Sequence, residues 1–294
     1  VQCHPAERDH IQRVHSDATS FQYSNGSVWA YQFATMLGLQ TQVAGPVLGG
    51  GLGANYASGG AATGPLNSGG FPPNLLTQTA FYISALGSAP APADSLYVVA
   101  GGGKNARDAL AEIAGGADPT ATITATAVQF AADIGSIVDS LQGKGAVNIA
   151  VWNVPNVGLA PAIAANGPTA AQLGTALSQA MNNALTNRLA SETGVQIFSM
   201  YGLVTAVNAN PTAYGLINAS DAAGAIPGAD LSQYLFWSGI HPTAAGHAIL
   251  AQSMYSAVVP EPSSCLLVAG LVLAVVAVRR RWTPRPQPSR EQVI

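Results

Sequence analysis

The sequence predicts an α/β fold in which helices cover both faces of a mainly parallel sheet. Three short runs, 95–100, 147–152 and 195–200, are apolar and rich in β-branched residues, as buried strands are. Amphipathic helical stripes lie between them, at Phe130, Ile134, Ile137 and Leu141 and at Leu173, Leu177, Met181, Leu185 and Leu189. Strands and helices that alternate in this order form parallel sheets.

The other expected elements surround that sheet. Thr169 is a plausible N-cap of the second helix, residues 208–236 read as mostly loop, and a last helix runs from about 243 to 257. Ligands of such sheets bind beyond the carboxyl ends of the strands. The loop at 101–105 lies there, and His241, just before the last helix, can reach the same edge.

The composition limits the function classes. Only 9% of the 294 residues are charged and the net charge is −3, which suits an exported protein and offers no basic face for nucleic acid. Cys3 and Cys265 lie at opposite ends of the chain, with no CxxC and no His/Cys cluster. We therefore expect no disulfide framework, no metal site and no cofactor.

The C-terminal region contains an apolar run, 265–278, that would form a helix about 21 Å long. This length is short of the ~30 Å hydrocarbon core of a bilayer, so length alone leaves a buried core helix open. Three features favour a membrane helix: its place near the chain end, the prolines Pro260 and Pro262 before it, and the arginines 279–281 directly after it.

Residues 259–282 combine a Pro-Glu-Pro triplet, the apolar run and the Arg cluster, and closely resemble the bacterial PEP-CTERM sorting signal. The resemblance implies export across the inner membrane of a Gram-negative bacterium and temporary anchoring there by the C-terminal helix. It also implies cleavage near Pro260-Glu261-Pro262 by an exosortase-type protease, and a final location at the cell surface or outside the cell.

Four stretches carry a second resemblance: "YSNGSVWAYQFATMLGL" (23–39), "NYASGGAATG" (55–64), "LYVVAGGGKNARDAL" (96–110) and "FWSGIHPTAAGHA" (236–248). In this order they resemble a GDSL-type esterase/lipase of the SGNH hydrolase superfamily. The resemblance implies a three-layer flavodoxin-like sandwich, a Ser-His-Asp triad, and carboxylic ester or lipid substrates. It divides the chain into an atypical segment (1–20), a hydrolase-like domain (21–257) and the sorting signal (258–294).

The resemblance also implies roles for individual residues. His241 matches the catalytic base, although a histidine that caps a helix is the alternative, and His247 reads as structural. Gly60 matches the glycine whose amide faces the oxyanion. Asn105 matches the side-chain oxyanion donor of the Gly-x-Asn-Asp block, whereas a register that keeps "RDAL" aligned puts Lys104 at that position.

Two departures from the family pattern affect catalysis. The family Asp lies three residues before the His, and Ser238 occupies that position. The Gly-Asp-Ser-Leu nucleophile block is not found, because Ser16 and Ser24 follow no apolar strand. Residues 1–20 also lack the apolar core of a signal peptide. We expect that this end is truncated or misread and that the chain, without a central first strand, is poorly soluble.

Two functions therefore stay open. The first is an exported ester hydrolase, impaired by Ser238, that works through an acyl-serine intermediate. The second is a pseudoenzyme that acts as a surface or matrix binding protein. An exported binding module without hydrolase ancestry is a third interpretation, which the four ordered stretches disfavour.

Overall fold

The computed structural model describes residues 23–39, 54–65 and 72–259. Its main sheet has three parallel strands, β1 (Tyr97–Ala100), β2 (Ile149–Trp152) and β3 (Val195–Phe198), in the order β1-β2-β3. The register pairs Tyr97 with Ile149 and Ile149 with Val195. All four residues of β2 are buried, which explains why this strand is uniformly apolar.

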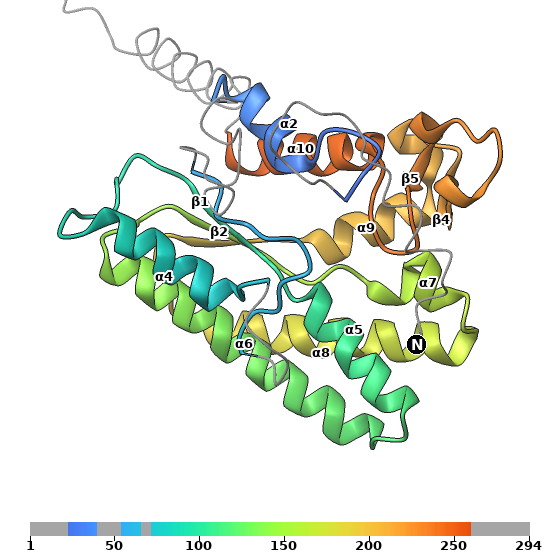
Figure 1. Cartoon of the computed structure of the whole chain (residues 1–294), viewed down its shortest axis with the longest axis horizontal. Helices are drawn as coiled ribbons and strands as arrows, with labels where there is room; N and C mark the ends of the chain where they lie inside the picture. The colour runs from blue at the N-terminus through green and yellow to red at the C-terminus, as the bar shows by residue number, and fades with distance from the viewer. Residues whose placement is uncertain (1–22, 40–53, 66–71, 260–294) are drawn as a thin grey trace, which may run out of the picture. The chain divides into compact units, whose positions relative to one another are not determined.

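One face of the sheet is covered by α4 (Leu75–Leu86), α5 (Gly103–Ala114), α6 (Pro119–Gly143) and α8 (Pro168–Leu189) (Figure 1). The main core lies here, with Phe130, Ile134, Leu177 and Met181 at most 1% exposed. By length and composition α6 could cross a membrane. Since its apolar face is buried in this core, α6 is the core helix of a folded domain.

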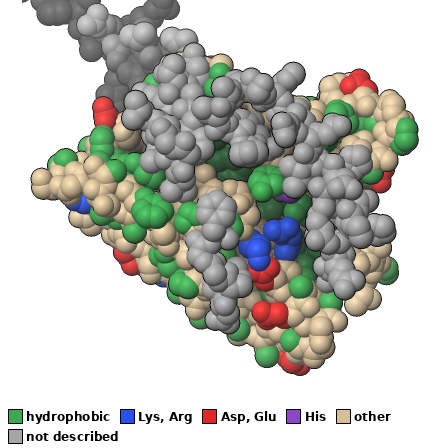
Figure 2. Space-filling model, in the orientation of Figure 1, with side chains coloured by type: hydrophobic (Ala, Val, Ile, Leu, Met, Phe, Trp, Pro, Cys, Tyr) green, Lys and Arg blue, Asp and Glu red, His purple; other side chains and the backbone are tan. Residues whose placement is uncertain are grey.

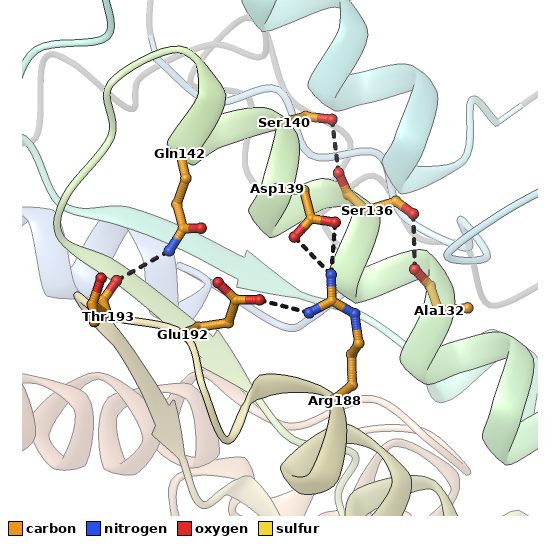
Figure 3. A network of polar contacts seen from close by, with 8 residues as sticks. All are labelled: Ala132, Ser136, Asp139, Ser140, Gln142, Arg188, Glu192 and Thr193. Carbon is orange, nitrogen blue, oxygen red and sulfur yellow. Dashed lines mark hydrogen bonds and ion pairs between the residues drawn. The ribbon is translucent and has the colours of Figure 1, made fainter.

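A cluster of ion pairs joins α6 to the end of α8 (Figure 3). Arg188 donates from Nη2 to both carboxylate oxygens of Asp139 at 2.6 Å and from Nη1 to Glu192 at 2.6 Å. The guanidinium passes close over Gly135, where a Cβ would lie 2.2 Å from Nε of Arg188. The arginine can take this path only because residue 135 has no side chain.

The opposite face carries α2 (Trp29–Met36) and α10 (Ala244–Val258), which makes three layers (Figure 1). Trp29 packs on Trp152 of β2 with ring centroids 4.1 Å apart, and Trp152 packs on Phe198 of β3 at 4.8 Å. The predicted α/β class, with a parallel sheet between helical layers, is confirmed.

Between α8 and α10 the structure contains more order than the sequence predicts. The stretch 208–236, expected to be mostly loop, holds β4 (Asn218–Ala222) and β5 (Tyr234–Phe236), which pair in parallel. The region between α8 and α10 also contains the helices α9 (Met200–Ala209), η3 (Pro211–Tyr214), η4 (Ala223–Ala225) and η5 (Leu231–Gln233). Two further short helices, η2 (Val157–Leu159) and α7 (Pro161–Ala164), lie between β2 and α8. Val207, Leu216 and Leu235 form a small core beneath β4 and β5.

Three local predictions are corrected. The segment 101–105 is not all loop, because α5 begins at Gly103 and contains Asn105. Thr169 does not cap α8, which starts at Pro168 after Gly167, without a side-chain cap. Proline suits this first position because its φ is preset and it has no N–H to satisfy. The third strand ends at Phe198, two residues early, because Ser199 caps α9. The predicted segments 1–20 and 265–278 lie outside the described residues.

Candidate active site

His241 sits in a tight loop between β5 and α10. The backbone nitrogen of Trp237 donates to the carbonyl of His241 at 2.8 Å, and Phe236 forms an antiparallel bridge with Pro242. On the other side of the loop, the nitrogen of Ala162 in α7 donates to the carbonyl of Gly239 at 2.9 Å. The imidazole is therefore carried by backbone that is fixed at both ends.

Ser238 contacts the ring of His241 directly. Its Oγ lies 2.9 Å from Nδ1 of His241. The same oxygen accepts hydrogen bonds from the backbone nitrogens of His241 at 3.2 Å and Ile240 at 3.4 Å. The hydroxyl thus occupies the place of an orienting group at Nδ1, but it carries no charge.

The Ser-Asn-Gly motif at residues 24–26 forms hydrogen bonds with the residues that follow His241. Ser24 donates from Oγ to the carbonyl of Pro242 at 3.1 Å, and Asn25 Oδ1 accepts from the nitrogen of Ala244, the first residue of α10, at 2.7 Å. Gln32 donates to the carbonyl of Ala244 at 3.0 Å. Ser24 is 1% exposed. Its hydroxyl is therefore a structural group and not a nucleophile.

Tyr23 links the histidine to the glycine-rich loop. Its ring is stacked on the His241 imidazole, with centroids 5.1 Å apart and an interplanar angle of 16°. A Cβ on Gly59 would lie 2.6 Å from the tyrosine ring, so the loop backbone touches the ring. The next residue, Gly60, is exposed and has a φ of +78°, which favours glycine. Tyr23 was not among the residues singled out from the sequence.

Asn105 anchors the same glycine-rich loop. Its Oδ1 accepts from the backbone nitrogen of Thr63 at 3.1 Å, and its Nδ2 donates to Thr63 Oγ1 at 3.0 Å. Thr63 in turn donates to Asp133 at 2.7 Å, and Gln129 donates to the other oxygen of that carboxylate at 2.7 Å. Asn105, Thr63 and Asp133 are all at least nine-tenths buried. The network ties the loop after Gly60 to α5 and α6.

Lys104, the residue of the alternative register, is part-exposed and pairs with Asp108 one turn along α5. Figure 2 shows Lys and Arg side chains gathered beside a histidine on the face where α5 begins. Within the described residues, no group of three or more His, Cys, Asp or Glu side chains could hold a metal ion.

His247 lies on the first turns of α10 and is 7% exposed. Burial, and to a smaller extent the nearby His241, lower its pKa to about 4. Its Nδ1 has no hydrogen-bond partner in the part of the chain that the structure describes. This histidine is therefore a neutral core residue at physiological pH.

Two family models match the chain. A family model described as GDSL-like Lipase/Acylhydrolase matches residues 12–254. The chain belongs to the GDSL-like lipase/acylhydrolase family. A second model, the PEP-CTERM protein-sorting motif, matches residues 258–281 directly after it. No curated protein sequence matches the chain. A GDSL-type hydrolase domain is thus followed by a signal for export and sorting toward the cell surface.

Four parts of this GDSL-family domain that are distant in sequence meet at the candidate site. The His241–Ser238 loop and the Tyr23 segment touch directly, and Tyr23 touches Gly59 beside Gly60. Asn105 contacts the same loop at Thr63. Of the serines considered as nucleophiles, Ser24 is buried against Pro242, and Ser16 lies outside the described residues.

Proposed function

We propose that the protein is an exported ester hydrolase with His241 as its general base, and that Ser238 limits its turnover. The stack and loop contacts that fix His241 beside the Gly59–Gly60 backbone are the main support for this proposal. In the reaction, Nε2 of His241 takes the proton of the attacking serine hydroxyl and returns it to the leaving alcohol. Water then hydrolyses the acyl-serine in the same way.

The hydrogen bonds of Ser238 give a physical reason for limited turnover. Its oxygen already accepts from two backbone nitrogens, so its own O–H is best used as a donor to Nδ1 of His241. That arrangement puts the ring proton on Nε2, and a base needs Nε2 unprotonated. A carboxylate at this position would accept from Nδ1–H and would also stabilise the imidazolium. Its loss in a serine hydrolase lowers kcat by on the order of 10⁴-fold.

For the oxyanion, we propose the backbone amide at Gly60 as the donor. Asn105 uses its amide oxygen and nitrogen on Thr63, and that favours a role in holding the loop. In the alternative register Lys104 takes the family Asn position, and it would have to leave Asp108 to reach an oxyanion. A lysine there would supply charge to the oxyanion in place of an amide donor.

The second candidate function is a pseudoenzyme that binds a ligand at the surface or in the matrix. The uncharged Ser238 at Nδ1 is the observation that favours it. For either function we propose that an exosortase-type protease processes the chain near Pro260-Glu261-Pro262. A temporary inner-membrane anchor formed by residues 265–278 belongs to the same proposal.

The test is run in a chain that carries the family's Gly-Asp-Ser-Leu nucleophile block. It compares this wild type with Ser238→Asp, Ser238→Asn and His241→Ala by hydrolysis of p-nitrophenyl acetate. A hydrolase predicts a gain of about 10³- to 10⁴-fold in kcat for Ser238→Asp. It predicts no such gain for the uncharged control Ser238→Asn, and loss of turnover in His241→Ala. Turnover that survives in His241→Ala would refute its role as base. If both the wild type and Ser238→Asp are inactive while folded, the pseudoenzyme is supported.

A further inference from the structure

The contact between Tyr23 and His241 is the starting point. The two rings are nearly parallel, with an interplanar angle of 16° and centroids 5.1 Å apart. The face of an aromatic ring attracts a cation that lies within about 6 Å of the ring centroid. The imidazole of a catalytic histidine becomes such a cation each time it accepts the serine proton.

Contacts on both sides hold Tyr23 in this position. On one side its ring touches the backbone at Gly59, where even a Cβ would lie within 2.6 Å of a ring carbon. On the other side the following residues, Ser24 and Asn25, are hydrogen-bonded to Pro242 and Ala244, directly after the histidine. The Gly59 backbone therefore limits the ring on one side, and the hydrogen bonds of Ser24 and Asn25 fix the chain that carries it.

Two other neighbours of the imidazole among the described residues, Ser238 and His247, do not favour its charged form. Ser238 at Nδ1 is neutral. His247, a titratable group near His241 on α10, is buried and neutral at physiological pH, so it offers no negative charge to the imidazolium. Of these three neighbours, only the face of Tyr23 attracts the positive charge. It is also accessible, since Tyr23 is 47% exposed.

We propose that Tyr23 is a positioning residue that stabilises the imidazolium of His241 through its ring face, and so supplies part of the charge stabilisation that a carboxylate at position 238 would give. The catalytic meaning of this inference rests on the proposed ester hydrolase. The ring–ring interaction itself does not, and it can be measured without turnover.

The experiment follows the ring C–H signals of His241 by NMR over pH 4.5 to 8.5, in the wild type, Tyr23→Phe and Tyr23→Leu. His241→Gln assigns the signals. Tyr23→Phe keeps the ring face and should keep the titration midpoint. Tyr23→Leu should lower the midpoint by about half a pH unit, the size expected of an exposed cation–π contact. Tyr23→Met, which also lacks a ring, replaces the leucine variant if that variant does not fold.

Each outcome is decisive. An unchanged midpoint in the folded Leu or Met variant, or an equal shift in Tyr23→Phe, would overturn the inference. If the midpoint shifts as expected but no variant hydrolyses esters, the inference stands and the proposed function fails. In an active protein, the acidic limb of the kcat/KM profile should shift with the midpoint in Tyr23→Leu and not in Tyr23→Phe. A purely structural role of the ring would not produce this difference.

Discussion

Burial of His247 predicts a loss of stability at mildly acidic pH. Its pKa is lowered from the usual 6.5 to about 4, first because burial disfavours the charged ring and second because His241 is near. Between these two values the unfolded chain binds more protons than the folded one, so stability falls as the pH falls. From pH 7.5 to pH 5 the loss from this residue is about 2 kcal/mol, and it approaches 3 kcal/mol near pH 4.

The measurement is urea unfolding, followed by tryptophan fluorescence at pH 7.5, 6 and 5, of the wild type and His247→Gln. The glutamine variant starts from a different stability, but the pH-dependent loss due to residue 247 should vanish. The wild type should thus lose about 2 kcal/mol more than the variant over this range. His241→Gln is the matched control and should keep most of the loss. Equal pH dependence of the wild type and His247→Gln would refute the reasoning.

Three further substitutions test the contacts that hold the site and the core. Asn25→Ala removes the acceptor for the first amide of α10 and should lower the free energy of unfolding by about 1 kcal/mol, whereas Asn25→Asp, which keeps the acceptor, should lower it less. Asp133→Ala leaves the hydroxyl and amide that it binds without an acceptor, and should cost about 2–3 kcal/mol in thermal unfolding. Gly135→Ala pushes against Arg188 and should cost about 1–3 kcal/mol. In an Arg188→Ala background the same substitution should cost little, and an equal cost there would contradict this explanation.

Much of the fold follows from local patterns. The strands β1, β2 and β3 and the apolar faces of α6 and α8 are visible because period and burial agree along each segment. The pair β4 and β5 could not be predicted from the sequence, because "NASDA", 218–222, has little β-propensity. Its pairing depends on the tertiary fold. The start of α5 could not be predicted, because the helix begins within a run of glycines that is typical of a loop.

The contacts of the candidate site also fall into those that the sequence predicts and those that it does not. Ser238 and His241 are three residues apart in one loop, so their contact is readable from the sequence. The stack of Tyr23 on His241 joins residues far apart along the chain, and no local pattern contains it. Asp133 lies between the core positions 130, 134 and 137, and a carboxylate on that apolar face was the available signal of a buried network.

The hydrogen bonds from Ser24 and Asn25 to the residues after His241 also indicate the order in which parts of the domain fold. These hydrogen bonds join residues 218 and 219 positions apart, whereas α5, α6 and α8 make their contacts between nearer segments. Contacts of such long separation close late, because the chain entropy of the intervening loop must be lost first. During synthesis Ser24 and Asn25 emerge 218 and 219 residues before their partners beside His241. The His241 loop therefore gains these contacts only when nearly the whole domain is available, so under the proposed function a partly emerged chain stays inactive.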